Sequence, residues 1–253
     1  MNLIKDYLDE QLVRIHTPAF IADDPVQFPR RYTGLQDIEI VSFIVSSITW
    51  GNRSMILRNA ERMLSKLGDS PYHYVMNEDY RALGRANIHR TFFESDLAYM
   101  LRGFRQIYAA HETMEKFLEQ TQAHKTDAPA WAFTQALQAV MAQANQHTTN
   151  TKCFPVHLDH SALKRINLAL RWLVRKDGIV DLGVWEILQP CRLYIPLDVH
   201  VGNTARELGL LERKNNDRKA VEMLTARLCE FCPEDPVKYD FALFGIGINR
   251  KKN

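Results

Sequence analysis

Apolar side chains recur three or four positions apart in several separate stretches of the chain. The clearest stripe begins at Ile56 and ends at Leu67, with apolar residues at i, i+4, i+7, i+8 and i+11, the spacing of one face of an α-helix. The same period recurs in 97–108 behind Ser95-Asp96, in 163–174 between Ser161 and Gly178, and in 220–228 behind Asn216-Asp217. Because Ser, Asp and Asn favour helix starts and Gly favours helix ends, we predict a helix in each stretch.

A different pattern occupies residues 38–50 (IEIVSFIVSSITW), which are apolar and rich in β-branched side chains. Such a run is compatible with a buried strand. A run of 13 residues is long for a strand but suits a buried helix, and the chain offers no evident partner strand. We therefore predict a central, fully buried helix here.

Residues 143–156 (QANQHTTNTKCFPV) are polar and have no period, which is typical of a loop or of a crossing between lobes. The helical stretches lie on both sides of it, from about residue 30 to 140 and from 155 to 253. We predict an all-α protein with two helical lobes, residues 1–150 and 151–253, and with the N-terminal helix packed on one of them.

Composition agrees with a globular helical chain. Of 253 residues, 46% are hydrophobic and 25% are charged, which excludes disorder, a collagen-like repeat and a disulfide scaffold for the chain as a whole. With 11 glycines and 10 prolines, a turn-rich all-β architecture is disfavoured.

The cellular compartment follows from the cysteines and the N-terminus. Four cysteines in a chain of this length suit a reducing compartment. The N-terminal segment lacks the uninterrupted apolar core of a signal peptide, and no stretch of about eighteen apolar residues runs without charge. We therefore expect a cytoplasmic protein with no membrane contact.

Charge is unevenly distributed, although the formal net charge is only +2. Residues 1–151 carry 15 lysines and arginines against 17 acidic residues, whereas residues 152–253 carry the remaining 17 against 13. A basic half is compatible with a polyanionic partner. Solvated helix faces explain the same balance, so charge alone does not decide between the two.

The most informative stretch is 195–210 (IPLDVHVGNTARELGL). Pro196 favours an extended entry, and Asp198 stands where a helix begins. A carboxylate at that position accepts backbone N–H groups and lies at the positive end of the helix dipole, and both effects keep it ionised. On the residues alone, Asp198 is either a simple helix cap or a functional carboxylate.

This stretch resembles the catalytic-aspartate segment of the helix-hairpin-helix DNA glycosylases, the superfamily of endonuclease III and the 8-oxoguanine glycosylases. Their pattern is an apolar residue, Asp, any residue, His, an apolar residue and a closing Leu-Gly-Leu, for which the chain supplies Leu197, Asp198, His200, Val201 and Leu208-Gly209-Leu210. Residues 46–52 are similar to the early helix pair of that superfamily, and residues 236–245 to its terminal helix. The resemblance implies a two-lobed helical glycosylase-like fold with a cleft between the lobes. As a whole, the chain looks most like a sporadic bacterial family of unknown function.

Glycosylases of this superfamily that also cut the strand use a lysine at the start of the helix after the hairpin. Lys164 is similar in position, because it lies in the first turn of the predicted 161–175 helix, 34 residues before Asp198 (198 − 164), a separation near that of the archaeal 8-oxoguanine branch. A helix N-terminus, burial and the neighbouring Arg165 each disfavour the ammonium form, and a nucleophilic amine must be neutral. Two alternatives stay open: Lys176 as the nucleophile, and a purely surface role for Lys164.

The resemblance implies a base-excision repair enzyme, a DNA glycosylase with associated AP-lyase activity on an oxidised purine such as 8-oxoguanine in double-stranded damaged DNA. The damaged base is flipped out of the stack, Asp198 stabilises the cationic sugar, and Lys164 attacks C1′ to give a Schiff base. The side chains expected to contact the base or the DNA are Thr49, Trp50, Asn52, His160, Ser161, Arg165, Arg171, Arg175, His200 and Phe244.

Basic and aromatic side chains supply the rest of the expected DNA contacts. A basic stripe of Lys164, Arg171 and Arg175 and the tail 250–252 (RKK) are expected to bind phosphates. Candidates for stacking on a flipped base, which as residue types are more often found in a core, are Trp50, Trp172, Trp185 and Phe244.

The chain departs from the glycosylase pattern in the hairpin. In that superfamily a Gly-x-Gly lets backbone amides approach a phosphate, whereas residues 157–161 (HLDHS) contain no glycine. His160 and Ser161 are the side chains that would take its place. The difference favours a second hypothesis, a non-catalytic nucleic-acid-binding protein with a degenerate glycosylase-like fold; a purely structural helical protein is the third.

Metal chemistry is not indicated by the sequence. The pair Cys229-x-x-Cys232 has no second pair and is followed by Pro233, so we expect structural thiols. One short loop holds residue types that bind zinc, without a clean tetrahedral spacing: Cys153, His157, Asp159 and His160. We expect no metal, no cofactor and no obligatory protein partner.

Overall fold

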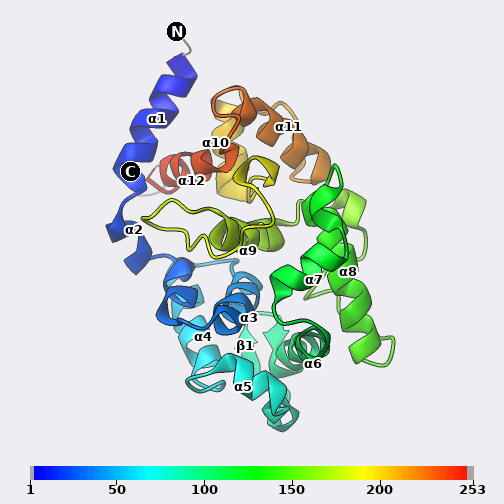
Figure 1. The fold of residues 1–253 in the computed structure, drawn as a ribbon. Coiled ribbons are helices and arrows are strands. Elements are labelled where there is room, and N and C mark those ends of the chain that lie inside the picture. The colour runs from blue at the N-terminus through cyan, green and yellow to red at the C-terminus, as the bar shows by residue number, and fades with distance from the viewer. Residues whose placement is uncertain (1–2, 250–253) are drawn as a thin grey trace. The chain divides into compact units, whose positions relative to one another are not determined.

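The computed structural model describes residues 3–249 and is predominantly helical (Figure 1). Within these residues the one sheet is an antiparallel hairpin of β1 (Asn87–His89) and β2 (Phe92–Phe93). The all-α prediction is confirmed. The helices are α1 (Leu3–Ile15), α2 (Pro18–Ala22), α3 (Leu35–Ser46), α4 (Arg53–Leu64), α5 (Pro71–Met76), α6 (Glu94–Ala110), α7 (Met114–Gln120), α8 (Pro129–Ala144), α9 (Lys164–Val174), α10 (Val199–Glu207), α11 (Arg218–Cys229) and α12 (Tyr239–Asn249).

The chain divides into two compact units, residues 22–156 and residues 1–21 together with 157–253. The main boundary falls just after the predicted one at 150/151. The first 21 residues, however, belong with the C-terminal unit, which differs from the predicted N-terminal lobe 1–150. Tail residues 250–252, expected to bind phosphates, lie outside the described residues.

Helix α3 confirms the prediction of a buried helix in the 38–50 run. All of its residues from 38 to 46 are buried, because a helix that is apolar on every side has to be enclosed by its neighbours. Within the unit of residues 22–156 it packs against α5 and α6. The β-branched side chains therefore fill a helical core, and burial outweighs their strand propensity.

A carboxylate is buried in the same helix. Glu39 accepts the N–H of Met114 at 2.9 Å, the N–H of Glu115 at 3.1 Å and the hydroxyl of Tyr108 at 3.0 Å. Met114 and Glu115 open α7, so the charge is stabilised by unpaired amides at the positive end of a helix. Burial, together with this carboxylate, holds the pKa of Tyr108 well above its ordinary value.

One helix start follows its predicted signal closely: Asp217 caps α11 by accepting the N–H of Ala220. Asn52, for which no start signal was predicted, caps α4 in the same way. Helix α9 begins at Lys164, three residues after Ser161. Helix α6 begins at Glu94, before the predicted Ser95-Asp96 signal, because the Asp96 carboxylate reaches back to the N–H of Phe93.

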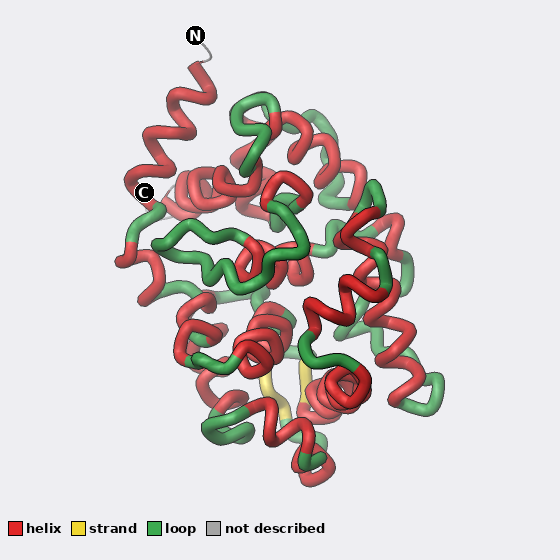
Figure 2. Tube along the Cα trace, in the orientation of Figure 1, coloured by secondary structure: helices red, strands yellow, loops and turns green. Residues whose placement is uncertain are grey.

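Helix α9 ends earlier than the glycine signal indicated. Its last residue is Val174, and Gly178 (φ 71°) lies in a following turn whose amides are bound by the Asp177 carboxylate. The irregular segment 175–198, drawn as loop in Figure 2 around the short 3₁₀ helix η6 (Pro190–Arg192), folds back along α9. The N–H groups of Leu182 and Trp185 bond to carbonyls in the last turn of α9, each at 2.8 Å. These bonds satisfy acceptors that a helix end leaves open.

The N-terminal residues join the C-terminal unit through α12. Helix α1 packs along α12, as Figure 1 shows, and α10 packs on α12 as well. The Tyr239 hydroxyl donates to Asp9 at 2.9 Å, and the Ile15 side chain lies directly over Gly245. This packing explains why residues 1–21 do not group with the lobe that follows them in sequence.

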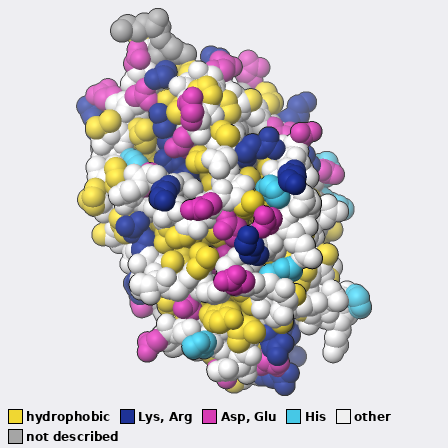
Figure 3. Space-filling model, viewed as in Figure 1, with side chains coloured by type: hydrophobic (Ala, Val, Ile, Leu, Met, Phe, Trp, Pro, Cys, Tyr) yellow, Lys and Arg dark blue, Asp and Glu magenta, His cyan; other side chains and the backbone are white. Residues whose placement is uncertain are grey.

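The surface carries both signs of charge. On the face shown in Figure 3, basic and acidic side chains are interspersed, with no continuous field of either sign. Within residues 3–249, no helix combines the length and the apolar character needed to cross a bilayer.

The contact between α1 and α12 gives a stability prediction. A Cβ at Gly245 would lie 1.9 Å from Cδ1 of Ile15, so Gly245→Ala is expected to lower the free energy of unfolding by about 1–3 kcal/mol in spite of its better helix propensity. In Gly245→Ala/Ile15→Ala the new methyl group enters the space that Ile15 vacates. Urea denaturation of the single and double variants should therefore show that the double variant loses about 1 kcal/mol less stability than the two single losses added together. Strictly additive losses would contradict this packing.

Candidate active site

Asp198 is the N-cap of α10, as predicted. Its Oδ1 accepts the N–H of Val201 at 2.9 Å, and its carbonyl accepts the N–H of Gly202 at 2.9 Å and the side-chain amide of Asn216 at 3.0 Å. Within the part of the chain that the structure describes, Oδ2 accepts no hydrogen bond. The hydrogen bond to Oδ1 therefore fixes the orientation of the carboxylate.

Lys164 is the first residue of α9, whereas the sequence predicted it within the first turn of a helix over 161–175. The residue before it, Leu163, has a left-handed backbone (φ 46°), and the N–H of Leu163 donates to the Ser161 hydroxyl at 3.2 Å. Helix α9 therefore starts from a tight turn with no side-chain cap. The half-buried Lys164 lies where the positive end of the helix dipole is strongest.

A third residue, Asp240 in the first turn of α12, connects these two. Burial raises the pKa of Asp240 to about 6; the Arg171 guanidinium and Lys164 act to lower it, and the charges of Asp198 and Asp181 act to raise it. Helix α9 is joined to α12 by the ion pair of Arg171 and Asp240, and α10 packs on α12. Lys164 and Asp198, 34 residues apart in sequence (198 − 164), therefore lie near the same buried carboxyl group.

An aromatic pair lies beside this group. Asp240 and Phe244 are four residues apart on α12 and so share one face of the helix. The half-buried His200 ring, two residues after Asp198, meets the Phe244 ring edge-on with 6.3 Å between centroids. Three helices thus bring an amine, a carboxylate, a buried acid and an aromatic face together.

Lys176 is poorly placed to replace Lys164. It is exposed and lies two residues beyond Val174, at the C-terminal end of α9. A helix of 11 residues is about 16 Å long, so the two lysines are at opposite ends. Of the two, it is Lys164 whose charge acts on Asp240.

The prediction that a basic stripe binds phosphates is wrong for Arg171 and Arg175. Arg171 is 2% exposed and Arg175 is 3% exposed, so neither reaches a phosphate at the surface. Arg171 pairs with Asp240 and, at 3.3 Å, with Asp181. Its guanidinium also lies 4.2 Å from the centroid of the Phe241 ring.

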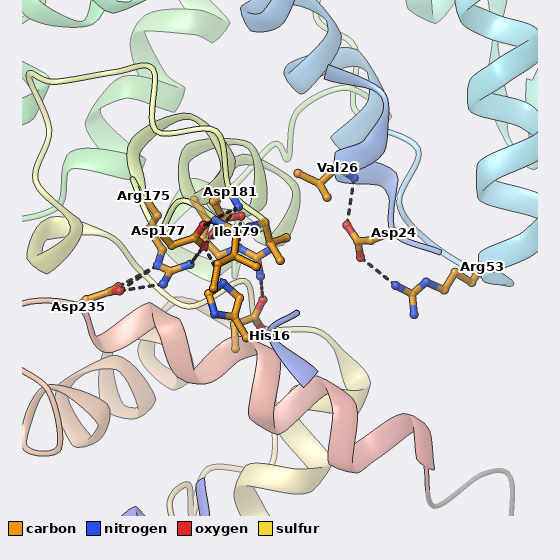
Figure 4. A network of polar contacts seen from close by, with 12 residues as sticks. His16, Asp24, Val26, Arg53, Arg175, Asp177, Ile179, Asp181 and Asp235 are labelled. Atoms are coloured by element: carbon orange, nitrogen blue, oxygen red, sulfur yellow. Dashed lines mark hydrogen bonds and ion pairs between the residues drawn. The ribbon is translucent and has the colours of Figure 1, made fainter. Parts of the chain in front are cut away.

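Arg175, the residue directly after α9, lies in the same cluster (Figure 4). Its guanidinium donates to both oxygens of Asp235, each at 3.0 Å from Nε, to Asp177 at 2.9 Å and to Asp181. His16 completes the cluster with 2.8 Å between Nε2 and the Asp177 carboxylate. The sequence period grouped the two arginines, and they do lie in one cluster, but that cluster is in the interior and Arg175 lies beyond the helix.

The other predicted DNA contacts of this unit lie nearer the surface. His160, the last residue of the 3₁₀ helix η5 (Leu158–His160), is exposed, and Ser161 and Arg165 are half-buried. The turn without glycine is closed by the Ser161 hydroxyl and by the left-handed backbone of Leu163. Trp172 and Trp185, proposed as stacking partners, are core residues with 0% and 2% exposure, so the structure excludes that role for them.

Thr49, Trp50 and Asn52 belong to the other unit, residues 22–156. The buried Thr49 hydroxyl donates to the Ser46 carbonyl at 2.7 Å. The half-buried Trp50 meets the His89 ring edge-on at 4.9 Å, and its carbonyl lies 2.8 Å from His89 Nε2. Burial lowers the pKa of His89. Asn52 is exposed and caps α4.

The thiol and histidine groups singled out in the sequence do not converge. Cys153 is buried with its Sγ 3.5 Å from the Asp96 carbonyl, whereas His157, Asp159 and His160 are exposed. Cys229 and Cys232 are free thiols. Among residues 3–249, no three His, Cys, Asp or Glu side chains gather as metal ligands.

Asp240 and Arg171 are the site residues whose roles the sequence analysis missed. One signal was available: Asp240 is the one acidic residue of α12 (YDFALFGIGIN), which is otherwise almost wholly apolar. A charge in such a helix has to be paired or functional. Its partner, an arginine 69 positions earlier, is not recognisable from spacing.

Comparison with known proteins places the chain in one family. The model of a protein family of unknown function, DUF2400, matches residues 24–249. No curated protein and no solved structure matches the chain.

The raised pKa of Asp240 predicts a pH dependence of stability. Because the folded value of about 6 lies above the ordinary 3.8, protonation of Asp240 stabilises the fold; this contribution is complete below about pH 4 and is lost as pH rises through 6. Across pH 4.5–7.5, the unfolding free energy of wild type relative to Asp240→Asn should fall by roughly 2 kcal/mol.

A second aspartate supplies the control of opposite sign. Although burial acts to raise it, the pKa of Asp177 is held below its ordinary value by His16, backbone amides and Arg175. The difference in unfolding free energy between wild type and Asp177→Asn should therefore be constant above about pH 5. Wild type should lose stability relative to the variant only in more acid solution. Urea titrations at each pH measure both differences, and a flat Asp240 curve would contradict the burial of an acid there.

Proposed function

The chain belongs to the DUF2400 family of proteins of unknown function, and we propose that it is a DNA N-glycosylase with AP-lyase activity on an oxidised purine such as 8-oxoguanine. One observation carries the proposal: Lys164 begins α9 and Asp198 begins α10, and both helices contact α12, the helix that carries the buried Asp240. An amine and a carboxylate at one place are what the two halves of this reaction require.

Asp198 acts on the sugar. As the bond between C1′ and the base weakens, positive charge develops on the sugar ring, and a fixed carboxylate oxygen stabilises it. The hydrogen bond from Val201 to Oδ1 orients the group in advance and leaves Oδ2 to face the sugar. The base departs with the electron pair of the broken bond and takes up a proton.

Lys164 acts as the nucleophile. Its neutral amine donates an electron pair to C1′, and the ammonium proton it must first lose passes to solvent or to a nearby carboxylate. The C1′–O4′ bond then breaks, O4′ takes up a proton, and a protonated Schiff base forms. Loss of a C2′ proton to solvent or a nearby carboxylate forms the C2′–C3′ double bond, and the 3′ phosphate leaves with the electron pair of its C–O bond. The dipole of α9 favours the neutral amine at this position.

The Phe244 ring supports a base-binding role for the same region. It lies one turn from Asp240, and the His200 ring packs against it edge-on. A half-buried aromatic face offers stacking energy of about 1–3 kcal/mol to an extruded base.

A second candidate function is a nucleic-acid-binding protein without catalysis. The absence of glycine in 157–161 and the burial of Arg171 and Arg175 favour it, because both remove expected phosphate contacts.

Borohydride trapping separates the two functions. Duplex DNA with one 8-oxoguanine or one abasic site is incubated with the protein, and borohydride reduces a Schiff base to a stable amine that shifts the protein on a denaturing gel. Wild type should form the adduct. Lys164→Gln should lose it because no amine remains, and Asp198→Asn should retain trapping at the abasic site while base release slows about 100-fold or more.

Lys176→Gln is the matched control, since it removes a lysine from the other end of α9 and should trap like wild type. Loss of the adduct in Lys176→Gln but not in Lys164→Gln would reverse the assignment of the nucleophile. No adduct from wild type on either duplex, with DNA binding intact, would support the non-catalytic function.

A further inference from the structure

The turn between α10 and α11 holds a basic pocket that the catalytic proposal does not use. The pocket has a volume of about 410 Å³ and is lined by Glu212, Arg213, Lys214, Asn215, Lys219 and Met223. Three of these side chains are cationic and one is anionic. Lys214 and Lys219 are exposed, and within residues 3–249 neither is paired with a carboxylate.

The pocket is built on a fixed turn. Arg213 pairs with Asp217, the N-cap of α11, with 2.7 Å between Nε and the carboxylate. The Arg213 carbonyl accepts from Arg206 of α10 at 2.8 Å, and Arg206 also donates to the Asn216 side chain at 2.5 Å. The backbone that carries Lys214 and Asn215 is thereby held on both sides.

The same turn is bonded to the candidate active site. The Asn216 side-chain amide donates to the carbonyl of Asp198 at 3.0 Å. A Cβ added to Gly202, in the first turn of α10, would come within 2.7 Å of Asn216 Oδ1, which shows how closely the turn packs there. The basic pocket is therefore one residue from a side chain that contacts the backbone of Asp198.

We propose that this pocket binds a phosphodiester of the same DNA strand whose sugar Asp198 acts on, an identification of the strand that rests on the proposed function. The ammonium groups of Lys214 and Lys219, which within the described residues are not paired with a carboxylate, line a shallow pocket. Such a pocket suits a phosphodiester, which carries one negative charge and stays partly solvated when bound. Met223, which is 40% exposed, adds an apolar surface for the adjoining deoxyribose. This contact takes over part of the anchoring that Arg171 and Arg175, both buried, do not supply.

The test uses the whole protein and a duplex that carries a tetrahydrofuran abasic analogue, which binds but cannot form a Schiff base. Lys214→Gln/Lys219→Gln should weaken binding about tenfold and lower the slope of log K against log salt by about one, since one phosphate contact is lost. Glu212→Gln should tighten binding a few-fold, because it removes the one negative charge of the pocket lining.

The matched control is Lys116→Gln/Lys125→Gln, which removes two exposed lysines from the other unit and should leave affinity and salt slope close to wild type. Inorganic phosphate at millimolar concentration distinguishes a free-anion site from a strand site. Competition by phosphate at these concentrations, or equal affinities of the Lys214/Lys219 and control variants, would overturn the proposal, as would the absence of salt-dependent binding by wild type.

Borohydride trapping with natural abasic DNA tests the proposed catalytic function separately from the phosphate contact. If the Lys214→Gln/Lys219→Gln variant binds DNA more weakly but still forms the trapped adduct at saturating DNA, the phosphate contact and the catalytic function are both supported. If the pocket variant binds DNA more weakly but wild type never forms the trapped adduct, the proposed phosphate contact stands and only the proposed catalysis is rejected.

Discussion

Two arginines at the end of α9, Arg171 in its last turn and Arg175 directly after it, are buried among four carboxylates in the C-terminal unit. Each guanidinium pairs with at least two of them, and Asp181 is shared by both. Removing charges from water costs several kcal/mol each, and that cost is offset only when every donor and acceptor finds a partner. Losing one partner would leave an uncompensated buried charge, at a cost of about 3–5 kcal/mol. The cluster therefore constrains every segment that contributes to it.

Those segments are the ones that form the candidate site. Asp240 ties α12 to α9 through Arg171, and Asp177 and Asp181 hold the irregular segment after α9. His16 adds the N-terminal residues through Asp177. With α9 and α12 fixed in this way, the start of α9 and the first turn of α12 keep Lys164 near Asp240. Stability and site geometry thus depend on the same ion pairs.

The cluster also changes which charges are left for a partner. The C-terminal half is basic in sequence, but two of its arginines are neutralised inside the fold. The cations that remain at the surface include Lys214, on the turn that is bonded to Asp198 through Asn216, and Lys219, in the first turn of α11. A polyanion would meet local cationic positions on this unit, not a continuous basic stripe along α9.

The sequence alone predicted much of the local structure. The apolar period predicted α4, α6, α9 and α11, the length of the 38–50 run predicted the buried α3, and Asp198 was identified as the start of α10. These features depend on residues close in the chain, where helix period and capping act directly. The same reasoning put Lys164 in the first turn of α9.

Tertiary structure decided the rest. Arg171 and Arg175 fall on one helix stripe in the sequence, but a period does not say whether a charged stripe faces water or buried carboxylates from residues 177, 181, 235 and 240. The place of residues 1–21 with the C-terminal unit, and the role of Asp240, rest on contacts between positions as much as 230 residues apart. Such pairings are selected by the balance of desolvation and ion pairing in the folded core, which no local pattern encodes.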